Sequence, residues 1–132
     1  MQLKVNLSTR EKMMNKNNEK QNGANEDICK SFRFMWDNFP HPVLLVQKNR
    51  TIIDANEKAR RLGVIAGIRC RDISPYPDKC KNSCLADQAI STGNPQRIIH
   101  QEKNNLYATY WVPLHSVENG LYLHFVMDVP LQ

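Results

Sequence analysis

The chain has 132 residues and a mass of 15.3 kDa, enough for one domain with a buried core but too little for several. Its 41% hydrophobic and 23% charged residues are near globular averages, which excludes a wholly disordered chain and a miniature held together by many disulfides. The net charge is +5, but residues 1–25 carry most of this excess, so nucleic-acid binding by the remainder is not expected.

The first 25 residues are rich in Asn and Lys and poor in large apolar side chains, which predicts a disordered polar tail. This segment lacks the apolar centre of a signal peptide, and no stretch of the sequence is apolar for long enough to cross a bilayer. We therefore expect a cytoplasmic protein without membrane contact. In that compartment, cysteines are more often free thiols, metal ligands or redox groups than structural disulfides.

A helix is predicted over residues 26–39. It has Glu26 and Asp27 in its first turn and Pro40 just after its end. Its apolar side chains recur at helical spacing and include several aromatic rings: Ile28, Phe32, Met35, Trp36 and Phe39. We expect this face to cover the sheet of its own domain, and also to meet a second copy in a homodimer.

The next segments predict a β-hairpin and a short helix. The apolar run Val43 to Val46 and the β-branched run Thr51 to Ile53 flank a polar turn. Asn56 is a suitable N-cap for the helix that follows. Ala59 and Leu62 give that helix an apolar face, and Gly63 ends it.

The second half of the chain predicts one helix and three strands. Leu85, Ala86, Ala89 and Ile90 indicate a helix that stops at Gly93. The strands are expected at Gln96–Gln101, Leu106–His115 and Leu121–Val129. The last strand alternates, with Leu121, Leu123, Phe125 and Met127 on the face expected to be core.

This order of elements resembles a PAS domain, the sensory module of many bacterial signalling proteins. PVLLVQKNRTIIDANEKARRLG resembles the opening hairpin and Asn-initiated helix of that family, and AISTGNPQRI resembles its helix-turn-strand passage. YATYWVPLHSVENGLYLHFVMDV resembles its two long closing strands. The resemblance implies an α+β domain over residues 40–132, with a five-stranded antiparallel sheet and short helices on one face.

The resemblance also implies a sensory module of signal transduction that binds a small ligand or senses redox state, dimerises and acts on a signalling partner protein. A purely structural interaction domain is the alternative. Candidate core or pocket walls are Val43, Leu45, Ile53, Leu62, Leu85, Ile90, Leu123 and Phe125. The PAS resemblance does not identify the ligand.

Catalysis is not expected. The histidines at positions 41, 100, 115 and 124 do not fall into a Ser/His/Asp order or a metalloprotease helix. Flavin is not expected either, because Gly67 to Arg71 resembles the flavin-reactive stretch of the light-sensing PAS branch for only a few residues. Haem is not expected, because the helical region between Asn56 and Gly93 contains no histidine to serve as its axial ligand.

Three cysteines, Cys70, Cys80 and Cys84, lie within fifteen positions and form the most specific cluster in the sequence. They could hold zinc or an iron–sulfur cluster, with Cys29 or His41 as the fourth ligand. Alternatively they form a Cys80–Cys84 or Cys70–Cys84 disulfide, or simply pack. The nearby cations should favour the reactive thiolate form, and these are Arg69, Arg71, Lys79 and Lys81.

Overall fold

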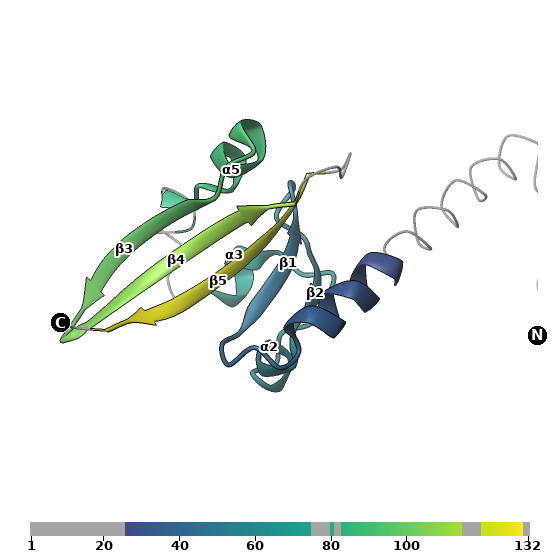
Figure 1. The fold of residues 1–132 in the computed structure, drawn as a ribbon, viewed down its shortest axis with the longest axis horizontal. Helices are drawn as coiled ribbons and strands as arrows, with labels where there is room; N and C mark the ends of the chain where they lie inside the picture. The colour runs from purple at the N-terminus through teal and green to yellow at the C-terminus, as the bar shows by residue number, and fades with distance from the viewer. Residues whose placement is uncertain (1–25, 75–79, 81–82, 115–119, 131–132) are drawn as a thin grey trace, which may run out of the picture.

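The computed structural model describes residues 26–74, 80, 83–114 and 120–130. The predicted polar tail, Lys79, Lys81 and His115 lie outside these residues. The elements are a helix over residues 26–36, called here the N-terminal helix, then β1 (Val43–Gln47), β2 (Ile52–Ala55), α2 (Glu57–Arg61), α3 (Cys70–Ile73), α5 (Ala86–Thr92), β3 (Gln96–Glu102), β4 (Asn105–Pro113) and β5 (Leu121–Val129) (Figure 1). Within the described ranges, no helix has the length and apolar character needed to cross a membrane.

The five strands form one antiparallel sheet in the order β2-β1-β5-β4-β3. The predicted hairpin of β1 and β2 is present, and β5 has the predicted bounds. β5 lies in the middle of the sheet, paired with β1 on one side and β4 on the other. The predicted α+β architecture, with a five-stranded antiparallel sheet and short helices, is confirmed.

Both faces of the sheet are covered, because β1 and β5 carry apolar side chains on both sides. On one face, the helix-side core contains Phe32 of the N-terminal helix together with Val43, Leu45, Leu121 and Leu123. The opposite face carries the cavity-side core, which contains Leu44, Val46, Ile52, Ala55, Ala59, Ala86, Ala89, Trp111 and Tyr122. The expectation of one core face on β5 is thus incomplete, since Tyr122 is only 1% exposed.

The N-terminal helix packs its aromatic face against the sheet of its own chain. Phe32 is 3% exposed, and Ile28, Trp36 and Phe39 pack around the same core. Four of the five side chains predicted to form a dimer interface therefore pack against the core of their own chain while the helix is docked. The predicted interface needs correction, because of that set only Met35 is largely exposed, at 65%. Dimerisation itself stays a prediction.

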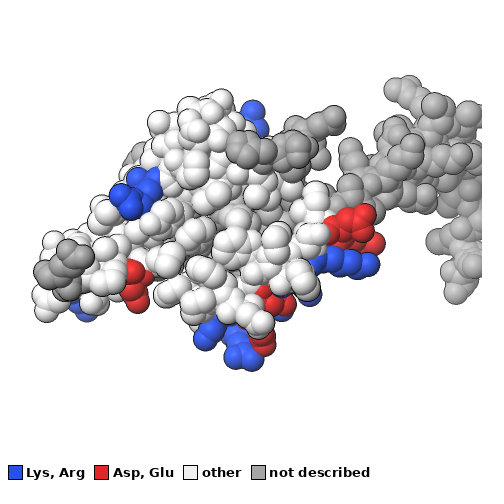
Figure 2. Space-filling view, in the orientation of Figure 1, with Lys and Arg blue, Asp and Glu red and all other residues white. Residues whose placement is uncertain are grey.

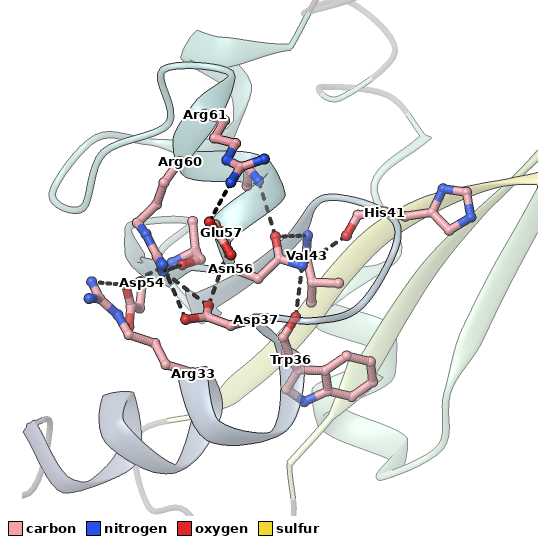
Figure 3. A network of polar contacts seen from close by, with 12 residues as sticks. Arg33, Trp36, Asp37, His41, Val43, Asp54, Asn56, Glu57, Arg60 and Arg61 are labelled. Carbon is pink, nitrogen blue, oxygen red and sulfur yellow. Dashed lines mark hydrogen bonds and ion pairs between the residues drawn. The ribbon is translucent and has the colours of Figure 1, made fainter.

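A polar network fastens the end of this helix to the junction of β2 and α2 (Figure 3). Arg33 donates two hydrogen bonds of 2.9 Å to the carboxylate of Asp54, whose side chain is 5% exposed. Arg60 bonds both carboxylate oxygens of Asp37 at 3.2 Å. Figure 2 shows charged side chains gathered near α2 and near the start of the N-terminal helix, with few over the strands seen in that view.

Local sequence signals set several of the element ends. Asn56 caps α2 as predicted, because its Oδ1 accepts the Ala59 N–H at 3.1 Å. Gly93 ends α5 in the left-handed conformation, with φ of 70°. The expectation for Leu62 is wrong, since this side chain is 74% exposed and only Ala59 of α2 is buried. Leu62 is the C-cap that follows the last residue of α2, so it lies outside the helix that carries Ala59.

Candidate ligand cavity

A cavity of about 1280 Å³ lies on the face of the sheet opposite the N-terminal helix. Its floor consists of alternate residues of the last three strands: Ile98, His100 and Glu102 of β3, Tyr107, Thr109 and Trp111 of β4, and Tyr122, His124 and Val126 of β5. Its other walls come from α3, from residues 80, 83 and 84, from Asp87 of α5, and from the hairpin residues Gln47, Lys48, Asn49 and Arg50.

Aromatic rings dominate the floor. Trp111 and His124 are partners across β4 and β5, and their rings stack with centroids 5.2 Å apart and an interplanar angle of 25°. His100 and Tyr107 are partners across β3 and β4, and their rings stack at 5.7 Å and 28°. The antiparallel register places both pairs on the same side of the sheet. Aromatic side chains therefore make up much of the cavity floor, although Trp111 itself is only 5% exposed.

His124 presents a neutral imidazole to this cavity. Its Nδ1 lies 3.0 Å from the Tyr110 carbonyl oxygen, and since a carbonyl only accepts, Nδ1 carries the proton. Burial lowers the pKa of His124 from its ordinary value, although the bond to Tyr110 opposes this effect. The second nitrogen, Nε2, is then an acceptor.

The turn between β1 and β2 brings a cation to the cavity. Arg50 adopts a left-handed backbone conformation with φ of 75°, which is uncommon for a residue with a side chain. Its Nη1 donates to the Lys48 carbonyl at 2.7 Å and to Asp87 Oδ1 at 3.1 Å. The pKa of Asp87 is lowered by this bond. The Arg50 carbonyl in turn accepts the Cys70 N–H at 2.9 Å, so the turn also positions the start of α3.

All three cysteines of the predicted cluster, Cys70, Cys80 and Cys84, line this one cavity. The two suggested fourth ligands do not join them, because the electrostatic partners of Cys29 are Asp54 and Arg33, and the His41 ring contacts Phe39 on the helix side. Among the residues that the structure describes, no three His, Cys, Asp or Glu side chains are grouped so as to hold a metal ion. The four cysteines are free thiols in this structure.

The expectation that flanking cations favour a thiolate is wrong for Cys70. Burial raises its pKa to about 12, the neighbouring Cys80 and Cys84 add to this increase, and Arg50 opposes it. Arg69 and Arg71 are exposed. Cys70 is consequently a protonated thiol at neutral pH.

None of the eight predicted wall residues lines the cavity. Val43, Leu45 and Leu123 are buried in the helix-side core, with Ile53 and Phe125 packed against it. The other three are spread elsewhere, with Leu85 and Ile90 packed against the cavity-side core and Leu62 exposed. The more apolar set of alternate residues in β5 faces the N-terminal helix. The other set, which mixes polar and apolar side chains, lines the cavity and consists of Tyr122, His124 and Val126.

The sequence interpretation considered His100 and His124 only in excluding catalysis, and both line the cavity. It did not single out Arg50, Tyr107, Trp111 or Tyr122. The sequence did contain a signal for Tyr122. A Tyr and a His at alternate positions of β5 are larger and less polar than the side chains usual on a solvent-exposed sheet face. The contribution of Arg50 could not be read from the sequence, since it depends on the conformation of a turn.

Solved structures similar to this one include a sensor histidine kinase and PAS domains. The structure of a sensory box sensor histidine kinase from Vibrio cholerae aligns over 96% of this chain and 100% of that chain, with a TM-score of 0.56 and 17% identity. The PAS domain of BvgS from Bordetella pertussis aligns over 80% of this chain and 89% of that chain, with a TM-score of 0.60 and 13% identity.

A domain of an HTR-like protein from Haloarcula marismortui aligns over 69% of this chain and 99% of that chain, with a TM-score of 0.54 and 18% identity. No protein-family model and no curated protein matches the sequence. These structural alignments, together with the strand order and the helices beside the sheet, show that the chain has a PAS-like fold.

Proposed function

We propose that this chain is a sensory module of signal transduction that binds a small ligand in the cavity over β3, β4 and β5. The observation that carries this proposal is the cavity itself, about 1280 Å³ in volume and lined by both aromatic and polar side chains. A sheet face that served only for packing would be filled by apolar side chains. Sensor histidine kinases are among the proteins with similar structures, which supports a sensory role.

Filling the cavity tests this proposal. Val126 lies on the cavity floor and is 41% exposed, so Val126→Trp places a large ring in the cavity. Ile99 is 49% exposed and lies on the opposite face of β3, so Ile99→Trp is a matched control. A ligand at a hundred times its dissociation constant stabilises a protein by about 2.7 kcal/mol, a readily measured thermal shift.

We expect compounds from a metabolite library to raise the melting temperature of the wild type and of Ile99→Trp, and to have no effect on Val126→Trp. Native mass spectrometry of the purified protein should show the same pattern for any compound that copurifies. If no compound distinguishes the two tryptophan variants, the ligand-sensing proposal fails. The purely structural interaction domain is then the better description.

A second candidate function is metal-dependent or redox sensing through Cys70, Cys80 and Cys84. The observation in its favour is that all three thiols line one cavity. Its test is zinc and iron stoichiometry with an absorption spectrum of anaerobically purified protein, and thiol counts before and after mild oxidation. The variants are Cys70→Ser, Cys80→Ser and Cys84→Ser, with Cys29→Ser on the other side of the sheet as control.

The redox candidate predicts that the three cavity variants lose bound metal or change the oxidised product, and that Cys29→Ser does not. Less than a tenth of an equivalent of metal, with thiols that oxidise independently of one another, would leave these cysteines as packing residues.

A further inference from the structure

The shape and chemistry of the cavity restrict the class of ligand, given the ligand-binding function proposed above. The floor offers two stacked pairs, Trp111 with His124 and His100 with Tyr107. Several of the wall residues have short side chains, namely Cys70, Ser74, Cys80, Ser83 and Cys84. Aromatic side chains on the floor and small side chains among the wall residues favour a ligand with a planar ring.

The charged groups around the cavity favour an anion. Three basic side chains, Lys48, Arg50 and Arg71, line it against two acidic ones, Asp87 and Glu102. Arg50 is the less exposed partner of the Arg50–Asp87 pair, at 26% against 71% for Asp87. Because solvent screens the exposed carboxylate, a second carboxylate on the cavity side of Arg50 would interact with the guanidinium more strongly than Asp87 does.

Arg50 lies near the aromatic floor of the cavity. The positive charge of Arg50 contributes to the lowered pKa of His124, which places the two groups within electrostatic range. Both hydrogen bonds that Arg50 donates to Lys48 and Asp87 use Nη1. Nε and Nη2 of a guanidinium form the side that binds a carboxylate through two parallel hydrogen bonds.

We propose that the cavity binds a planar aromatic carboxylate, with its ring against the aromatic floor and its carboxylate on the guanidinium of Arg50. Nε2 of His124 accepts a hydrogen bond from an N–H or O–H group on the ring. The two acidic residues, Asp87 and Glu102, disfavour a polyanion, since they would repel further negative charges.

The test is isothermal titration of the full chain at pH 7.5 with indole-3-carboxylate, its neutral isostere indole-3-carboxamide, and cyclohexanecarboxylate. We expect the indole carboxylate to bind at least about tenfold more tightly than the carboxamide, because a charge-assisted hydrogen bond is worth about 1.5–3 kcal/mol. It should also bind more tightly than cyclohexanecarboxylate, because only the indole ring can make aromatic contacts with the floor. Equal affinity for the carboxylate and the carboxamide would overturn the proposal, as would absence of carboxylate binding up to millimolar concentration.

Two variants test whether Arg50 is the cation that binds the carboxylate. Arg50→Gln should weaken carboxylate binding about tenfold or more and leave carboxamide binding within about twofold. Arg97→Gln makes the same change of charge on the other face of β3 and should leave both within about twofold. Circular dichroism and thermal unfolding confirm that each variant is folded.

A second variant leaves Arg50, and therefore the conformation of its turn, unchanged. Asp87→Asn removes a highly exposed competitor for Arg50 and should strengthen carboxylate binding by about two- to fivefold. A decrease would contradict the proposal. If library compounds of another class bind the wild type and not Val126→Trp, the sensory proposal stands and the carboxylate proposal falls.

Discussion

The side chain of Asn56 joins several elements by hydrogen bonds. It is fully buried, and its Oδ1 accepts the N–H groups of Val43 at 2.9 Å and Ala59 at 3.1 Å. Its Nδ2 donates to the carbonyls of Trp36 at 3.0 Å and His41 at 2.8 Å. One amide thus connects the end of the N-terminal helix, the start of β1 and the first turn of α2 (Figure 3).

Asn56→Ala should lower the free energy of unfolding by about 3 kcal/mol or more, because it leaves several buried backbone groups without partners. Asn49→Ala is the control, since Asn49 is exposed and accepts only the Thr51 N–H, at 2.9 Å. That change should cost less than about 1 kcal/mol. Urea denaturation measures both values, and similar losses for the two variants would refute the role assigned to Asn56.

Cys70 should be an unreactive thiol in the folded protein. Burial raises its pKa from 9.0 to about 12, so its thiolate fraction near neutral pH is lower by about a thousandfold. Peptide mapping after iodoacetamide treatment at pH 7.5 should show alkylation of Cys70 at least about a hundredfold slower in the native chain than in urea. The native rate should keep rising with pH above 9. A rate that levels off near pH 7 would mean that a thiolate is stabilised there.

At the scale of elements, the N-terminal helix divides into a docked side and an exposed side. Phe32 is 3% exposed and Phe34 is 91% exposed, although they are two residues apart. Phe32→Asp should reduce the free energy of unfolding by at least about 3 kcal/mol, because it removes a core ring and buries a charge. Phe34→Asp should change it by no more than about 0.5 kcal/mol.

Thermal unfolding of both variants measures these effects, and equal destabilisation would show that the helix is not docked as described. Sedimentation of Phe34→Asp also addresses the expected homodimer without disturbing the fold. If the wild type is a dimer and this variant is a monomer, the exposed side of the helix carries the interface. A dimer that survives Phe34→Asp must use another surface.

The elements themselves were largely readable from the sequence, because their signals are local. Asn56 marks the start of α2 and Gly93 marks the end of α5, each within one turn. The alternation that marks β5 lies within that one strand. The pairs that join distant elements were not readable: Arg33 and Asp54 are 21 positions apart, and nothing near either residue specifies its partner. The residues that line the cavity were also missed, because β1 is apolar on both faces and alternation alone does not say which face meets a ligand.

At the scale of the whole molecule, the two cores share the same strands. In β1, Val43 and Leu45 belong to the helix-side core, whereas Leu44 and Val46 belong to the cavity-side core. In addition, the Tyr110 carbonyl accepts from His124 on the cavity side, while the Tyr110 ring stacks on Phe125 at 5.0 Å on the helix side. Loss of either core should therefore disturb the backbone that supports the other.

We expect the domain to unfold in one cooperative transition. The chain has two tryptophans, and they report separately on the two cores. Trp36 packs near Phe39 and Phe125 on the helix side, and Trp111 stacks on His124 in the cavity floor. In Trp111→Phe, the fluorescence of Trp36 should therefore follow the same urea transition as far-ultraviolet circular dichroism. In Trp36→Phe, the fluorescence of Trp111 should do likewise.

Comparison within each variant removes the effect of the substitution on stability, so only the coincidence of the two probes matters. If the Trp36 signal changes at a lower urea concentration than the circular dichroism, the N-terminal helix undocks before the sheet unfolds. The shared-strand argument would then be wrong, because the helix-side core could be lost without the cavity-side core. Coincident transitions in both variants would instead mean that the docked helix and the ligand cavity are parts of one cooperative unit, so that ligand binding in the cavity also stabilises the helix on the far face.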